Sequence, residues 1–341
     1  MTRSARFANV IWWCYHSPLA DPYGENTRSM RLPQRFYRLP VRFDVDRLRA
    51  EIAEIPADAW VAHPTGEPGN SAVRLISVGG GDNDQMHGAM GMTRYLERLP
   101  YVRQILAGFG VAWSRSRLLR LAPGAEVKTH ADIYRHWFYR TRVHIPIKTL
   151  PAVEFTCDGE SVHMAAGECW IFDNWRQHAV RNPTGVERIH LVADTSGDAR
   201  FWEFVARGLN PAAPIEYRSY EENDARTLLV ERYFPRAIMS PEEMDLLVLD
   251  TRSELIVEAD TPENRARLAQ YHALLLGLSR DWRQLYILHG EDPEGRAEFV
   301  ALRERVRERL QAVSTGLIMR TNHVTAQRLL EARILRVCVL G

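Results

Sequence analysis

Residues 153–173 read VEFTCDGESVHMAAGECWIFD, and this stretch decides the fold class. Two short runs, Val153 to Cys157 and Glu160 to Met164, flank Asp158-Gly159. That dipeptide suits the positive φ angles of a tight hairpin turn. Gly167 then leads into a further short run, Glu168 to Phe172. Short apolar-alternating runs separated by turn residues predict antiparallel strands.

The same pattern extends outward, from about Arg115 to Thr195. The run Arg115 to Leu121 precedes the turn Pro123-Gly124, and Asn182 to Gly185 separates two further runs. Several short antiparallel strands in succession are typical of a β-sandwich or barrel, with a jelly roll among the choices.

The flanking regions have helical patterns. Asp44 is placed to cap a helix predicted from Val45 to Ile55. After about residue 215, Ser240-Pro241-Glu242-Glu243 forms a capping box with proline at the first helical position. A stripe at three- and four-residue steps predicts an amphipathic helix and comprises Phe299, Leu302, Val306, Leu310 and Val313. We therefore predict a β domain with N-terminal helical elements over residues 1–214 and a helical domain over 215–341.

Composition narrows the class of protein. The 341 residues include 44 Lys and Arg against 43 Asp and Glu, a balance that disfavours a nucleic acid or a membrane surface as partner. No apolar run reaches the ~18 residues of a membrane span, so we expect a cytoplasmic protein. The four cysteines lack a C-x-x-C pair and are expected to be free thiols. The oligomeric state is left open.

A metal site is indicated by His130-Ala131-Asp132 and the distal His178. If His130 and Asp132 lie in a strand, their side chains point to the same side and can bind one ion. A second imidazole from another strand would complete two nitrogens and one oxygen. This ligand set, with the other positions open, suits non-haem Fe(II) enzymes that bind a cosubstrate and O₂.

A carboxylate anchor is indicated by Arg188, ten residues after His178 and beyond the Asn182 to Gly185 turn. A guanidinium can bind a carboxylate with two parallel hydrogen bonds, as a dicarboxylate cosubstrate would need. In Arg142-Val143-His144-Ile145-Pro146, strand alternation places Arg142 and His144 on one face and the apolar side chains on the other. These two polar residues are therefore expected to line the same cavity.

Together these motifs resemble the aspartyl/asparaginyl β-hydroxylase family of 2-oxoglutarate dioxygenases, and especially its bacterial L-proline 3-hydroxylase branch. The segments that carry the resemblance are His130 to Asp132, Arg142 to Pro146, Gly167 to Asp173, His178 to Asn182 and Arg188 to Asp194. The segment Glu231 to Glu243 resembles the helical C-terminal domain of that branch. Asp132 supplies a metal carboxylate that the animal-type aspartyl hydroxylases lack, which favours the free-amino-acid hydroxylases.

The resemblance implies a double-stranded β-helix, the cupin-like jelly roll, with Fe(II) bound by His130, Asp132 and His178. It also implies that Arg188 binds the far carboxylate of 2-oxoglutarate and that Arg142 and His144 line its pocket. The enzyme would use O₂ to hydroxylate an aliphatic carbon of an amino acid, releasing succinate and CO₂. No catalytic residue is expected beyond the metal ligands.

Three functions stay open at this point. The substrate is a free amino acid, such as proline or an Asp- or Asn-like one, or it is an Asp or Asn residue within a peptide or protein. The third alternative is a non-catalytic cupin that binds a metal or a small acid. For a free amino acid, Arg74, Arg117 and Arg120 are candidate carboxylate anchors. The glycine run before Asp82-Asn83-Asp84 is not followed by the residues of a phosphate-binding loop, so it predicts only an ordinary loop. No role in the site is predicted for His136, His163 or His190.

Overall fold

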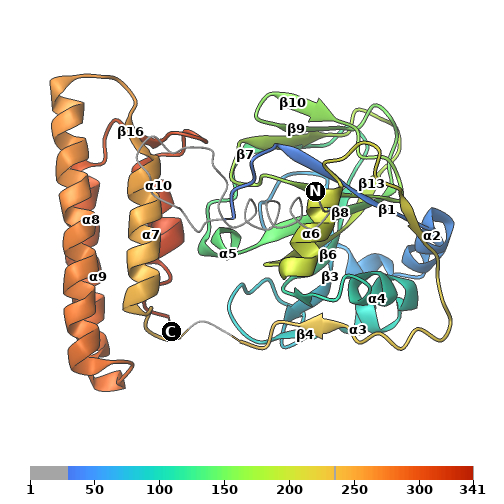
Figure 1. Cartoon of the computed structure of the whole chain (residues 1–341), viewed down its shortest axis with the longest axis horizontal. Helices are drawn as coiled ribbons and strands as arrows, with labels where there is room; N and C mark the ends of the chain where they lie inside the picture. Colours follow the sequence, from blue (N-terminus) through green and yellow to red (C-terminus); the bar gives the residue numbers. More distant parts are fainter. Residues whose placement is uncertain (1–29, 234–235, 341) are drawn as a thin grey trace, which may run out of the picture. The chain divides into compact units, whose positions relative to one another are not determined.

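The computed structural model describes residues 30–233 and 236–340 (Figure 1). Within them the chain forms two compact units. The first comprises residues 30–130 and 139–233, and the second comprises residues 131–138 and 236–340. The predicted domain boundary between residues 214 and 215 stays a prediction.

The first unit has a double-stranded β-helix at its centre. Four of its strands are neighbours in the larger sheet, in the order β11-β8-β13-β6, and four form a second sheet in the order β10-β9-β12-β7. All pairings within these two sets are antiparallel. The eight strands are β6 (Ser116–Leu121), β7 (Glu126–His130), β8 (Thr141–Lys148), β9 (Glu154–Cys157), β10 (Glu160–Val162), β11 (Glu168–Phe172), β12 (His178–Arg181) and β13 (Arg188–Thr195). This topology is the jelly roll, so the predicted fold class is confirmed, and Figure 1 shows its two layers.

The predicted hairpin joins β9 to β10. Cys157 pairs with Glu160 across it, and the two turn residues have φ angles of 48° at Asp158 and 78° at Gly159. Positive φ at both central residues is what the favoured two-residue hairpin turn requires. Cys157 also pairs with His178 on β12, so this hairpin extends the sheet that carries the distal histidine.

Further strands widen the larger sheet on both sides of the jelly roll. They are β1 (Phe36–Phe43), β2 (Val61–Ala62), β3 (Asn70–Val78), β4 (Met90–Met92) and β14 (Glu216–Arg218). A separate pair of short parallel strands consists of β5 (Ala112–Trp113) and β15 (Leu229–Val230).

Helices cover the outer face of the larger sheet. They are α2 (Val45–Ala53), α3 (Arg94–Glu97), α4 (Pro100–Ala107) and α6 (Ala199–Arg207). Asp44 caps α2 as predicted, because its carboxylate accepts from the N–H groups of Asp46 and Arg47. The helices share one apolar core with Val143 and Ile145 of β8 and with alternate residues of β13. Since strand side chains alternate, the polar residues between them face the second sheet.

The second unit is mainly helical. Its elements are α5 (Arg135–Phe138), α7 (Pro241–Glu254), α8 (Pro262–His289), α9 (Arg296–Val313), α10 (Ala326–Leu330) and the pair β16 (Leu255–Val257) and β17 (Leu317–Met319). Ser240 caps α7 as predicted by accepting from the N–H of Glu243 at 3.3 Å. The first four residues of the predicted stripe on α9 are buried. The helical C-terminal region is therefore confirmed.

Two expectations about single features can be compared with the described residues. Cys157, Cys169 and Cys338 are buried free thiols, and Cys14 lies outside the described residues. Across residues 30–233 and 236–340, no helix combines the length and the apolar character that crossing a membrane requires.

Candidate active site

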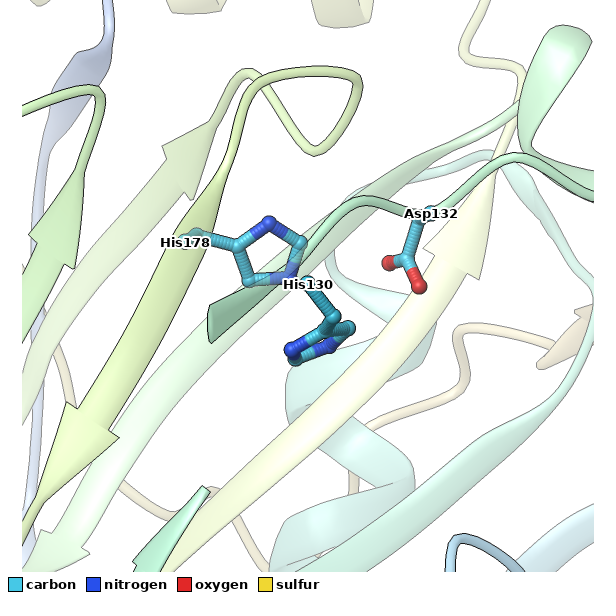
Figure 2. A group of neighbouring side chains, drawn as sticks. All are labelled: His130, Asp132 and His178. Carbon is cyan, nitrogen blue, oxygen red and sulfur yellow. The ribbon is translucent and has the colours of Figure 1, made fainter. Parts of the chain in front are cut away.

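The two histidines of the predicted metal site face each other across neighbouring strands. β7 ends at His130, β12 begins at His178, and the two residues pair directly. Their ring centroids are 4.2 Å apart. Asp132 lies in the loop after β7, so the strand alternation that predicted its direction does not apply to it. One ligand atom from each of the three residues nevertheless lies within 4.8 Å of the others, and Figure 2 shows the rings and the carboxylate together.

Backbone carbonyls select the tautomer of both imidazoles. Nδ1 of His130 lies 2.8 Å from the carbonyl oxygen of Lys128, and Nδ1 of His178 lies 2.9 Å from that of Arg176. A carbonyl oxygen only accepts, so each Nδ1 carries the proton and donates. The Nε2 lone pairs then remain for a metal ion, and the carbonyls act as the outer partners that orient ligating histidines.

Burial keeps the distal histidine neutral. His178 is only 4% exposed, and loss of solvent, aided by the neighbouring His130, lowers the pKa of His178 to about 3. A neutral imidazole can bind a metal ion at physiological pH. Two imidazole nitrogens and one carboxylate oxygen are the ligands of the non-haem Fe(II) facial triad, so the donor set fits that ion.

Apolar and aromatic residues fill the space between the sheets next to His178. The ring of Phe172 lies 4.8 Å from the His178 ring and 5.4 Å from the His144 ring. The buried apolar cluster here comprises Leu121, Phe155, Cys157, Met164, Phe172 and Val180. The site therefore borders a dry interior, in which unpaired charges are costly.

Arg188 is a buried cation in this interior. The residue is 4% exposed, and burial lowers the pKa of its guanidinium to about 9. Its Nη2 lies 2.7 Å from Nδ1 of His190, and its Nε has no hydrogen-bond partner within residues 30–233 and 236–340. Among the residues that the structure describes, no carboxylate pairs with it. A buried guanidinium without an acidic partner is unfavourable unless a ligand supplies the anion.

Arg142 and His144 lie on the same strand, β8, but their surroundings differ. Arg142 forms a two-point contact with Asp194, with Nε 2.8 Å and Nη2 3.3 Å from the two carboxylate oxygens. His144 is buried, and loss of solvent and then the nearby Arg188 hold its pKa well below the usual value. Val143 and Ile145 point into the core on the opposite face, as the alternation predicts.

The structure adds a residue that the sequence patterns did not single out, Asp84. Its carboxylate contacts the guanidinium groups of both Arg74 and Arg117, two of the predicted substrate anchors. Arg74 and Arg117 are directly paired across β3 and β6. The sequence offered one signal for Asp84, which is one of two acidic residues that follow a glycine run. Its contact with Arg117 could not be predicted, because the two residues are distant in the sequence.

Glycine makes this loop possible. Gly80 has a φ of 68°, and a Cβ there would lie 2.3 Å from the carbonyl oxygen of Met92 on β4. Only glycine fits both the left-handed backbone and the close approach. The loop can therefore turn back beside β4 and present Asp84 to the arginines.

Arg120, the third predicted anchor, lies on the other face of the sheet. It is three residues from Arg117 on β6, so strand alternation separates the two side chains. Its guanidinium lies 4.4 Å from the centroid of the Trp60 ring, and its Nε donates to Ser71 Oγ at 3.0 Å.

Comparison with known proteins places this geometry in a family. Residues 88–197 match the family model described as aspartyl/asparaginyl β-hydroxylase. These residues are similar to that family. The matched segment contains all three candidate metal ligands as well as Arg188 and Arg117, whereas Arg74 and Asp84 precede it. The resemblance seen in the sequence is thus confirmed over these residues. They match a hydroxylase family, and an oxygenase of this type implies iron and 2-oxoglutarate.

Several solved structures are similar to this chain at low sequence identity. A 2OG-Fe(II) oxygenase family protein from Burkholderia pseudomallei is 16% identical, with a TM-score of 0.32, over 45% of this chain and 78% of that one. A prolyl-4-hydroxylase from Pseudomonas putida is 16% identical, with a TM-score of 0.33, over 48% of this chain and 92% of that one. A cupin domain from Bordetella pertussis is 20% identical, with a TM-score of 0.20, over 24% of this chain and 79% of that one. No curated protein matches the chain in sequence.

Proposed function

We propose that this protein is an Fe(II)- and 2-oxoglutarate-dependent dioxygenase that hydroxylates an aliphatic carbon of an amino acid and releases succinate and CO₂. The observation that carries the proposal is a His–Asp–His ligand set close to a buried arginine, Arg188, that has no acidic partner among the described residues. A cytoplasmic location remains part of the prediction.

Each site residue has a role in this proposal. His130, Asp132 and His178 would hold Fe(II) and leave its other positions open. Bound iron, with 2-oxoglutarate and O₂, supplies the oxidising chemistry, whereas the protein supplies binding, orientation and exclusion of water. Arg188 would bind the far carboxylate of the cosubstrate, and Arg142 and His144 would line its pocket.

A free amino acid is the substrate that the charged cluster around Asp84 favours. A zwitterion needs a cation for its carboxylate and an anion for its ammonium group. Arg74 and Arg117 offer guanidinium groups, and the Asp84 carboxylate between them offers the negative charge. The proposal covers proline and Asp- or Asn-like amino acids, and Arg120 stays a predicted anchor.

An anaerobic titration tests the proposal. Fe(II) and 2-oxoglutarate are added to the purified protein, the visible spectrum is recorded, and succinate is measured after air is admitted. A weak charge-transfer band followed by succinate is expected. If both are absent, the protein is a binding cupin rather than an oxygenase.

A substrate screen then separates the two enzyme alternatives. Succinate formation is compared across the free amino acids and across short peptides that contain Asp or Asn. We expect coupled turnover with a free amino acid. Turnover with peptides alone would replace the free amino acid by a peptidyl residue as the substrate.

A further inference from the structure

The arginines that face the jelly-roll interior differ in what neutralises them. Arg142 pairs with Asp194, and Arg117 pairs with Asp84. Arg188 contacts instead a nitrogen of His190, at 2.7 Å from its Nη2. Within the described residues this guanidinium is thus held by an imidazole where the others are held by carboxylates.

The direction of this hydrogen bond follows from the chemistry of the pair. A guanidinium only donates, so Nδ1 of His190 must accept and the ring proton must be on Nε2. Loss of solvent and the adjacent Arg188 hold the pKa of His190 well below its usual value. His190 is therefore a neutral acceptor.

The surroundings hold the His190 ring in place. Arg188 and His190 are two residues apart on β13, so both side chains point to the same side of the sheet. His190 is 2% exposed, and its ring meets the His144 ring edge-on with centroids 5.8 Å apart. A packed ring keeps its acceptor in one position, and this restricts the guanidinium to one orientation.

We propose that His190 is a positioning residue of the cosubstrate site, which orients Arg188 through Nδ1 without neutralising it. The inference rests on the proposed function. An acidic residue at position 190 would also orient the guanidinium, but its charge would repel the 2-oxoglutarate dianion and compete for the same N–H groups. A neutral imidazole leaves the whole positive charge for the ligand, which in a dry interior attracts an anion strongly.

Three substitutions at position 190 separate orientation, charge and packing. His190→Phe keeps the ring and removes the acceptor. His190→Asn places an amide oxygen near the position of Nδ1 and stays neutral, whereas His190→Asp supplies an acceptor that carries a negative charge. His136→Phe, at a buried histidine on α5, is the control for replacing a buried imidazole by a phenyl ring.

The readout is ligand binding by calorimetry, with melting temperature measured on each variant. One probe is 2-oxoglutarate with the Fe(II) protein under anaerobic conditions. The second is glutarate with the metal-free protein, because glutarate has the far carboxylate but no keto group for metal chelation. A hydrogen bond to a charged group corresponds to about tenfold or more in affinity, so His190→Phe is expected to weaken both ligands at least ~10-fold.

The variants must follow one order for the proposal to stand. The dissociation constants of His190→Asn for both dicarboxylates should lie within about threefold of those of the wild type. His190→Asp should bind them at least as weakly as His190→Phe. Unchanged binding in His190→Phe, or tight binding in His190→Asp, overturns the proposal. If His190→Phe does not fold, the comparison of Asn with Asp decides.

The proposed function fails separately. If the wild-type protein binds neither 2-oxoglutarate nor glutarate, the dioxygenase proposal is wrong. If the wild type binds both ligands and the three variants bind them equally well, only the role of His190 is wrong.

Discussion

Replacement of Arg188 by methionine should weaken cosubstrate binding while leaving the fold intact. Methionine keeps much of the length and removes the charge, so the far carboxylate of 2-oxoglutarate loses its partner. A two-point charge-assisted contact is worth on the order of 3 kcal/mol, which corresponds to ~100-fold in affinity. We therefore expect the apparent constant for 2-oxoglutarate to rise at least ~100-fold, with iron affinity nearly unchanged.

The same substitution should not lower the melting temperature of the ligand-free protein. Burial holds the pKa of Arg188 down to about 9, so the charged side chain is less favourable in the folded chain than in the unfolded one. Each pKa unit corresponds to about 1.4 kcal/mol, and methionine removes this cost together with one hydrogen bond to His190. The expected melting temperature is equal to that of the wild type or higher.

Arg142→Met is the matched control, since this arginine has an acidic partner. Removing it takes a two-point contact away from Asp194, which is 1% exposed. Breaking a buried pair from one side costs about 3–5 kcal/mol, so this variant should melt at a lower temperature.

Calorimetric titration with 2-oxoglutarate, metal analysis and thermal denaturation on both variants measure these effects. An Arg188→Met protein that melts much lower and loses iron together with cosubstrate would show that Arg188 is structural. If Arg188→Met binds 2-oxoglutarate as tightly as the wild type, Arg188 is not part of the cosubstrate site and Arg142 is the carboxylate anchor.

Three further outcomes are expected. Asp132→Ala should stay folded but lose most bound Fe(II) and nearly all coupled succinate formation, because it removes an anionic ligand; wild-type turnover would mean that the two histidines suffice. Asp84→Asn should raise the KM for the amino acid substrate about tenfold, the effect of losing one charge-assisted contact, and leave the KM for 2-oxoglutarate unchanged. The buried His144 and His190 have pKa values held well below 6.5, so the unfolded chain takes up protons that the folded chain does not, and stability should fall as the pH drops below 6.5. Thermal denaturation between pH 5 and 8 measures this slope, and His190→Asn should make it shallower.

Local patterns predicted the elements whose causes are local. The hairpin at Asp158-Gly159 follows from backbone conformations that those two residues favour, and the start of α7 follows from the hydroxyl of Ser240. Alternation along β8 correctly assigned Val143 to the core. The same alternation argument does not apply to Asp132, because β7 ends at His130 and the direction of the Asp132 side chain depends on a loop.

The resemblance to a family predicted the site residues, but it did not indicate which acidic side chains would neutralise the arginines among them. The sequence does not show which of the three arginines, Arg117, Arg142 and Arg188, has an acidic partner. Whether each guanidinium is neutralised depends on side chains that approach from other strands and loops, such as Asp84, which lies 33 residues from Arg117 in the sequence. Spacing within one strand carries no information about such contacts.

The sequence by itself determined the tight turn at Asp158-Gly159 and the capped starts of α2 and α7, because each depends on residues that are neighbours in the chain. The ligand set was a prediction that rested on motif spacing and on the resemblance to a family. Only the tertiary structure decided that His130 and His178 meet across two strands and that Asp84 lies between two arginines. It also decided that Arg188 is buried against a neutral imidazole. The physical reason is that charge compensation and desolvation depend on what surrounds a group in space, and that environment exists only after the sheets have packed.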